Sequence, residues 1–205
     1  MRTVLYKVGG SLLTDSTLFA RLEQFLQTRD QQEFALILVG GGAKVDLIRE
    51  QDVLNAEQDD EKSHQLALKV MDSNAELALK ALPASKAILQ QSDLDHAVQR
   101  GEGRPVLFAQ KLLTELEPRS DLQLPHTWEA TSDSIGAWLT ITLKLDEFRL
   151  LKSIPPLPET ELISGNSDGV DRAFHRYVSQ LPGLSWVNFR QEQLVPDIHY
   201  YNRIS

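Results

Sequence analysis

Apolar and polar residues along this chain form blocks that predict alternating strands and helices. Residues 4–8 are apolar except for Lys7, and this block ends at Gly9 and Gly10. Residues 34–39 form a second apolar run, which ends at three consecutive glycines, 40–42. Unbroken apolar runs of this kind are typical of parallel strands that are covered on both faces.

Helical periodicity follows each glycine turn. Apolar residues at positions 18, 22, 25 and 26 fall on one face of a helix, and a capping residue is expected at 15–17. Positions 45, 47 and 48 are apolar in the next predicted helix. Two strand–glycine–helix units within the first fifty residues predict βαβ organisation with a right-handed crossover.

Later blocks continue this pattern. Helices are predicted over 64–82, 93–99, 110–115, 171–181 and from Ser132, as the cap, to about 143; strands over 86–89, 105–108, 148–151 and 184–189; and loops over 28–33, 55–61 and 120–128. Prolines at 155, 156 and 158 argue against regular structure there. We therefore expect one domain over 1–205 of the α/β class, a three-layer α/β/α sandwich around a mainly parallel sheet.

Composition narrows the classes of function. The 205 residues carry a net charge of −8, which argues against nucleic acid or an anionic membrane as the main partner. No apolar run approaches membrane-spanning length and no basic-then-apolar segment opens the chain, so we expect a cytoplasmic location. There is no cysteine, and the five histidines show no paired spacing on one helix, so no protein-built metal site is predicted.

The first glycine turn has the features of an anion site. Gly9 and Gly10 expose backbone N–H groups, the next helix directs its positive end to the same place, and Lys7 adds a full charge. A tight turn beside a snorkelling lysine is the alternative interpretation. The second turn has three glycines in a row, Gly40, Gly41 and Gly42. Two such turns at the carboxyl ends of strands would face one crevice and hold phosphoryl groups.

A third segment places hydroxyl and carboxylate groups at a helix start: Thr131, Ser132, Asp133 and Ser134. Taken alone, this segment is more simply explained as a helix cap. The two common phosphate motifs, G-x-x-x-x-G-K-[ST] and a helix-opening G-x-G-x-x-G, are absent. The sequence therefore does not predict an ordinary P-loop enzyme or an ordinary dinucleotide-binding protein.

Together these motifs resemble the amino acid kinase superfamily, which includes acetylglutamate, aspartate, uridylate and isopentenyl phosphate kinases. The resemblance lies in Lys7-Val-Gly-Gly-Ser11, Gly40-Gly-Gly42 and Ser132-Asp-Ser-Ile-Gly-Ala137. The chain is more closely similar to small members typified by the (5-formylfuran-3-yl)methyl phosphate kinases of methanofuran biosynthesis. The residues that support this narrower resemblance are His64-x-x-Ala67-x-x-x-Met71-Asp72, Trp128-x-x-Thr131-Ser-Asp-Ser-Ile135 and Gly169-Val-Asp-x-x-Phe174.

The resemblance implies phosphoryl transfer from ATP, with Mg²⁺ bound mainly through the nucleotide phosphates. Lys7 would stabilise charge on the transferring group, and Asp133 would orient Lys7. Residues expected to bind phosphate or substrate are Gly9, Gly10, Ser11, Gly40, Gly41, Gly42 and Arg49. For Arg49, a solvated helix residue is the alternative interpretation.

The chain departs from the superfamily pattern after residues 148–151. A Thr-Asp-x-x-Gly nucleotide loop is usual there, whereas this chain has Lys152-Ser-Ile-Pro-Pro156. Lys152 is predicted as a second catalytic lysine that also binds nucleotide, and its alternative is an ordinary exposed lysine. Ser153 and Asp171 are the other expected nucleotide-binding residues. This departure keeps open a rival function, a non-catalytic nucleotide- or metabolite-binding regulatory module.

The acceptor that the resemblance implies is a small molecule, a furanylmethyl phosphate in methanofuran-type cofactor biosynthesis. A carboxylate-bearing acceptor is the alternative. A homodimer is also expected, because the predicted helix over 64–82 has an apolar face with alanines at close-packing positions. In the alternative interpretation, that face covers the sheet of its own subunit.

Overall fold

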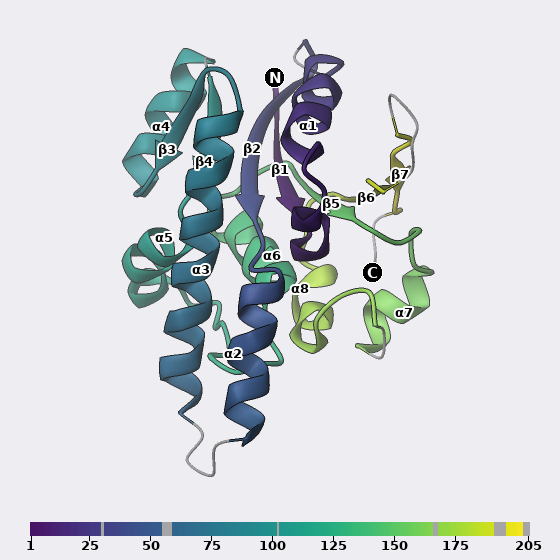
Figure 1. Ribbon diagram of the computed structural model, residues 1–205. Coiled ribbons are helices and arrows are strands. Elements are labelled where there is room, and N and C mark those ends of the chain that lie inside the picture. Colours follow the sequence, from purple (N-terminus) through teal and green to yellow (C-terminus); the bar gives the residue numbers. More distant parts are fainter. Residues whose placement is uncertain (30, 55–58, 102, 166–167, 191–195, 203–205) are drawn as a thin grey trace.

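A computed structural model describes residues 1–29, 31–54, 59–101, 103–165, 168–190 and 196–202. The described residues form a seven-stranded sheet in the order β3-β4-β2-β1-β5-β6-β7 (Figure 1). The strands are β1 (Arg2–Val8), β2 (Glu33–Val39), β3 (Ser85–Ile88), β4 (Arg104–Leu107), β5 (Glu147–Lys152), β6 (Leu184–Asn188) and β7 (His199–Tyr200). The pairings are parallel except that of β6 with β7. The predicted α/β class with a mainly parallel sheet is therefore confirmed.

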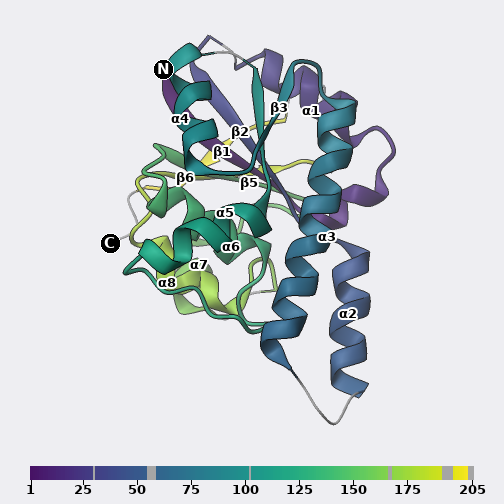
Figure 2. The same cartoon turned by 90° about the vertical axis from the view of Figure 1, so that its left-hand side faces the viewer.

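Helices cover both faces of this sheet, as Figure 2 shows from the side. Side chains alternate across β1, so Val4, Tyr6 and Val8 join one apolar cluster and Leu5 joins the other. The first cluster is covered by α1 (Leu18–Gln27) and part of α3 (Asp60–Ala81), and the second by α5 (Ala109–Leu116), α6 (Ser132–Thr142) and α8 (His175–Val178). The other helices are α2 (Ala43–Leu54), α4 (Gln91–Arg100) and α7 (Glu159–Ser164), with 3-10 turns η1 (Gly10–Thr14), η2 (Glu117–Arg119) and η3 (Arg172–Phe174).

Helices α2 and α3 form a hairpin that extends beyond the carboxyl ends of the strands (Figure 1). Helix α3 begins earlier than the sequence predicted, because Asp59 caps it by accepting a hydrogen bond from the Lys62 N–H at 3.0 Å. Asp60 and Glu61 therefore belong to the helix and not to the predicted acidic loop, whose residues 55–58 lie outside the described residues. Among the described helices, none combines the length and apolar character needed to cross a membrane.

The apolar face of α3 covers its own sheet. Met71, Ala75, Ala78 and Leu82 are each at most 3% exposed. The face that motivated the homodimer is thus already occupied within the chain, and the homodimer itself stays a prediction.

Near the C-terminal end, one predicted helix has different bounds and two short elements were not predicted. The predicted helix over 171–181 is a 3-10 turn, η3, followed by the single helical turn α8. Helix α7 begins directly after Pro158. Proline is favoured near the start of a helix because its φ is fixed and the N–H that it lacks would have no partner there. The antiparallel edge strand β7 contains only two residues, which is too short to give a period-two pattern.

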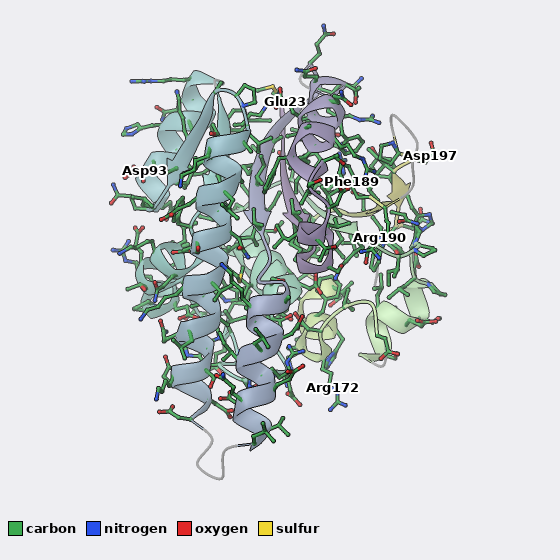
Figure 3. The ribbon with its side chains drawn as sticks, viewed as in Figure 1. Glu23, Asp93, Arg172, Phe189, Arg190 and Asp197 are labelled. Atoms are coloured by element: carbon green, nitrogen blue, oxygen red, sulfur yellow. The ribbon has the colours of Figure 1, made fainter. Side chains whose placement is uncertain are left out.

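After β6, Phe189 lies beside α1 (Figure 3). Its ring packs edge-on against that of Phe25.

A buried ionic network joins β1, β2, β5 and β6 on the α1 side of the sheet. Arg149 is fully buried and donates to Glu33 at 2.8 Å and to Glu147 at 2.6 Å. It also donates to the Tyr6 hydroxyl at 2.6 Å and to Ser185 Oγ at 2.8 Å. Burial by itself would raise the pKa of Glu33, but the hydrogen bonds from Arg149 and Tyr6 lower it. Glu33, predicted as part of a loop, is thus the first residue of β2 and a member of the core.

Replacing Arg149 with leucine should destabilise the fold by about 3–5 kcal/mol, because two carboxylates would remain buried without their central cation. Urea denaturation at pH 7 measures this loss. The deficit should shrink as the pH falls, because carboxylates that lose Arg149 have raised pKa values and become neutral first. Arg100→Leu, at an exposed position of α4, is the matched control and should change stability by less than about 0.5 kcal/mol. A loss below about 1 kcal/mol in Arg149→Leu would contradict this account.

Candidate functional site

The two glycine turns meet directly, backbone against backbone. The Gly40 N–H donates to the Val8 carbonyl at 2.9 Å, and the Gly9 N–H donates to the Leu151 carbonyl at 2.8 Å. A Cβ on Gly10 would lie 2.3 Å from the Gly42 nitrogen, so a side chain there has no room. Gly42 has φ of +64°, a left-handed conformation that favours glycine. The predicted convergence of the two turns at one edge of the sheet is confirmed by these contacts.

Asn74 on α3 holds the second turn in place. Its side-chain amide donates to the carbonyls of Gly40 at 2.8 Å and Gly41 at 3.0 Å. The first bonds of α2 run from the Val45 and Asp46 N–H groups to the Gly42 carbonyl, so the N–H groups of residues 42–44 have no partner within this helix. Asn74 was not predicted as a site residue, although a polar residue on the apolar face of a predicted helix can indicate a buried polar contact.

Lys7, Asp133 and Lys152 form one buried ion cluster at these turns. The ammonium of Lys7 lies 2.7 Å from Asp133 Oδ1, and that of Lys152 lies 2.7 Å from Asp133 Oδ2. Lys7 is 2% exposed and Asp133 is 5% exposed. The three residues come from β1, the start of α6 and the end of β5, so the fold brings together the three residues that the sequence predicted as catalytic.

The electrostatics of this cluster favour anions. Burial would raise the pKa of Asp133, but the charges of Lys152 and Lys7 lower it to about 2, so the carboxylate is ionised at neutral pH. Burial lowers the pKa of Lys152 to about 8, against the opposing effect of Asp133 and with a further lowering by Lys7. Two cations on one carboxylate leave a net positive charge beside the glycine turns at neutral pH.

Asp171 caps helix α6 from a distant part of the chain. Its carboxylate accepts hydrogen bonds from the N–H groups of Thr131 at 2.9 Å and Ser134 at 3.0 Å, and from both hydroxyls of these residues. The prediction that Ser132 caps this helix is wrong, because the N-cap position belongs to Thr131 and the capping oxygens to Asp171. Burial, with the nearby charge of Asp133, raises the pKa of Asp171.

Two adjoining cavities open at this cluster. The first cavity has a volume of about 270 Å³ and lies between the glycine turns, the α2–α3 hairpin and residues 127–135. The second cavity, about 690 Å³, is lined by residues 127–133 and 168–172. Lys152 lines both cavities, whereas Lys7 lines the first and Asp133 lines the second. Arg172, which lines the second cavity, lies at the same end of the molecule as α2 and α8 (Figure 3).

The remaining predicted site residues occupy different positions. Arg49 lines both cavities, and its guanidinium stacks over the Trp128 ring at 4.9 Å. Ser11 lines the first cavity, and its hydroxyl lies 2.9 Å from that of Ser153. Within the described residues, Ser153 is not part of either cavity wall. Asp171 lines the second cavity while it caps α6, so its proposed contact with a nucleotide stays a prediction.

Replacing Gly10 with alanine should push the two turns apart and weaken binding of pyrophosphate, a simple probe of the anion site. The added methyl group would meet the Gly42 backbone, which cannot rotate away as a flexible side chain does. Calorimetric titration should show at least a tenfold loss of affinity. The control is Gly101→Ala, which also strains a left-handed glycine, with φ of +61° at the C-cap of α4, but lies outside both cavity walls. This variant should lose some stability and still bind pyrophosphate as tightly as the wild type. Unchanged pyrophosphate binding by Gly10→Ala would contradict the close packing of the turns.

Comparison with known proteins identifies the fold. No protein-family model matches this sequence, and no curated protein sequence matches it. Among solved structures, UMP kinase from Ureaplasma parvum matches with a TM-score of 0.68 and 10% identity, over 93% of this chain and 92% of that one. UMP kinase from Bacillus anthracis gives 0.64 and 14%, over 94% and 89%, and uridylate kinase from Archaeoglobus fulgidus gives 0.61 and 16%, over 90% and 89%. This chain therefore has the fold of these uridylate kinases.

Proposed function

We propose that this protein is a small-molecule kinase that transfers a phosphoryl group from ATP to a small phosphate- or carboxylate-bearing acceptor. The observation that carries the proposal is the ion cluster, in which one buried carboxylate holds two lysine ammonium groups beside two converging glycine turns. The fold shared with the uridylate kinases supports it, since those proteins are named for phosphoryl transfer to UMP.

The two cavities suggest how the substrates are arranged. We assign the acceptor to the first cavity and the nucleotide to the second, with the phosphoryl group passing at Lys152, which lines both. Lys7 and Lys152 are held in place before the substrates arrive, so their charges stabilise the transferring group without a reorganisation cost. The glycine N–H groups position the phosphoryl oxygens, and no covalent enzyme intermediate is required.

Magnesium enters this proposal with the nucleotide. Among the described residues, no group of three or more His, Asp or Glu side chains is placed to hold a metal ion. Asp133 bonds two lysines and Asp171 bonds the start of α6, so both carboxylates at the cluster already have partners. An ion carried on the ATP phosphates would neutralise part of their charge, which is the usual contribution of Mg²⁺ in kinases.

The acceptor that we propose is a furanylmethyl phosphate, which would be converted to a diphosphate. The first cavity suits a small ring with one phosphate, because its lining combines the apolar side chains of Leu68, Met71 and Ile135 with the lysines and the glycine turns. A carboxylate-bearing acceptor is the alternative, since Arg49 and the two lysines would bind either anion. A panel of phosphate and carboxylate acceptors in an ADP-coupled assay decides between them.

Lys7→Ala should lower turnover about a hundredfold, which corresponds to the loss of about 3 kcal/mol of transition-state stabilisation. The affinity for ATP should change much less, because this contact acts mainly during transfer. Asp133→Asn should have a similar effect on turnover, since both ammonium groups would lose their anchor. Lys152→Ala separates its roles: a loss in turnover assigns catalysis, and a loss in ATP affinity alone assigns nucleotide binding. Full activity in a folded Lys7→Ala protein would refute the kinase proposal.

Activity should fall as the pH rises above about 8, because Lys152 then loses its proton and its charge. Below that pH the Lys152 ammonium is charged, so a further fall in pH should not raise the rate through this group. The profile of kcat/KM against pH measures the effect in the free enzyme. In Lys152→Arg the alkaline fall should disappear, because a guanidinium stays charged throughout. A wild-type profile that is flat to pH 10 would contradict the role assigned to the Lys152 charge.

A regulatory module is the competing function, favoured by the proline-containing segment that replaces the usual nucleotide loop. Calorimetry with Mg-ATP tests it directly. Micromolar binding of Mg-ATP that is lost in Lys152→Ala, together with ADP formation on an acceptor of the panel, would support the kinase. The absence of any ATP binding, or binding without turnover on any acceptor, would favour the module.

A further inference from the structure

His64 is a buried polar residue that the proposed reaction does not use. It lies on α3, is 6% exposed and lines the first cavity. Its Nε2 atom is buried and has no hydrogen-bond partner among the described residues. A buried polar atom without a partner costs free energy, so its presence calls for an explanation.

Burial, together with the stacked ring of His126, keeps His64 in its neutral form. The two rings stack at 4.1 Å and 8° from parallel. His126 Nδ1 lies 2.6 Å from Glu61 and its Nε2 lies 3.0 Å from Glu117. Both ring nitrogens therefore donate to carboxylates, and although burial opposes it, these contacts raise the pKa of His126. Burial, together with the positive charge on His126, lowers the pKa of His64 to about 4.

His64 lies at the end of the first cavity that is away from the glycine turns, where the phosphate groups are expected to bind. Asn74 marks the glycine turns on α3, and Met71, Leu68 and His64 follow toward the start of this helix. A rise of about 1.5 Å per residue puts His64 about 10 Å from the level of Met71 and about 15 Å from Asn74. A ligand with its anion at the turns would thus lay an apolar body along Met71 and Leu68 and end at His64.

We propose that His64 selects the acceptor, by forming a hydrogen bond with an uncharged polar group on the end of the acceptor that lies away from its phosphate. This rests on the proposed function and adds a requirement to it. The acceptor would combine an anionic group, a flat apolar middle and a neutral hydroxyl or carbonyl at the far end. A neutral imidazole suits such a group, since it offers a donor and an acceptor without attracting a second anion.

Two size-matched pairs of phosphate monoesters test this selection. The first pair is 3-hydroxybenzyl and 3-methylbenzyl phosphate, and the second is 4-(hydroxymethyl)benzyl and 4-ethylbenzyl phosphate. Binding is measured by calorimetry without ATP, so that turnover is not required. In the wild type, at least one hydroxyl compound should bind about tenfold more tightly than its apolar partner. In His64→Leu the preference should disappear, and in His64→Asn part of it should remain.

His96→Leu is the matched control, because it makes the same change at an exposed position of α4. It should keep the wild-type preference. A direct readout is the ¹⁵N chemical shift of His64 Nε2, assigned in the wild type through its through-bond correlations with the ring protons and backbone of His64. This shift should move with the preferred hydroxyl compound and stay unchanged with its apolar partner, and the measurement on the wild type does not depend on the variants folding.

Each result has one meaning. Equal binding within both pairs, with no movement of the His64 signal, would overturn the role of His64 and leave the proposed kinase function standing. If none of the four phosphates binds and none of the acceptors in the panel is phosphorylated, both the kinase function and the role of His64 fail together.

Discussion

The arrangement of this molecule depends on two buried ion pairs that Asp133 forms, one with Lys7 and one with Lys152. A carboxylate buried in a protein is costly unless each oxygen has a partner, and here each oxygen meets one ammonium group. The lysines come from β1 and β5, and Asp133 comes from α6. These elements must therefore be neighbours, which is satisfied by the central position of β1 beside β5 and by α6 packing on both strands.

Local sequence patterns were enough to predict the parallel strands and the two glycine turns. The apolar run of β2 is unbroken and that of β1 is interrupted only by Lys7, and a strand that ends in glycine can be predicted without knowledge of its neighbours. Lys152 could not be assigned in this way, because its place depends on strand order. Only the parallel register of β1 with β5, which pairs Val8 with Leu151, brings Lys152 level with Gly9.

Contacts between polar residues that lie far apart in the sequence escaped prediction. Asn74 bonds a turn more than thirty residues away, and Asp171 caps a helix that begins about forty residues before it. His64 and His126 stack although their spacing gave no sign of a pair. In each case the polar residue is ordinary in its own segment, and its purpose is set by an element that only the tertiary fold brings near.

The shared wall at Lys152 also has a consequence for how such a protein can change over evolutionary time. The α3 residues His64, Leu68 and Met71 line only the first cavity, and residues 168–172 line only the second, although six residues, Lys152 among them, line both. Substitutions along the α3 face can therefore alter which molecule is accepted while the opposite compartment keeps its composition. A scaffold with this division is able to diversify on one side and remain constant on the other.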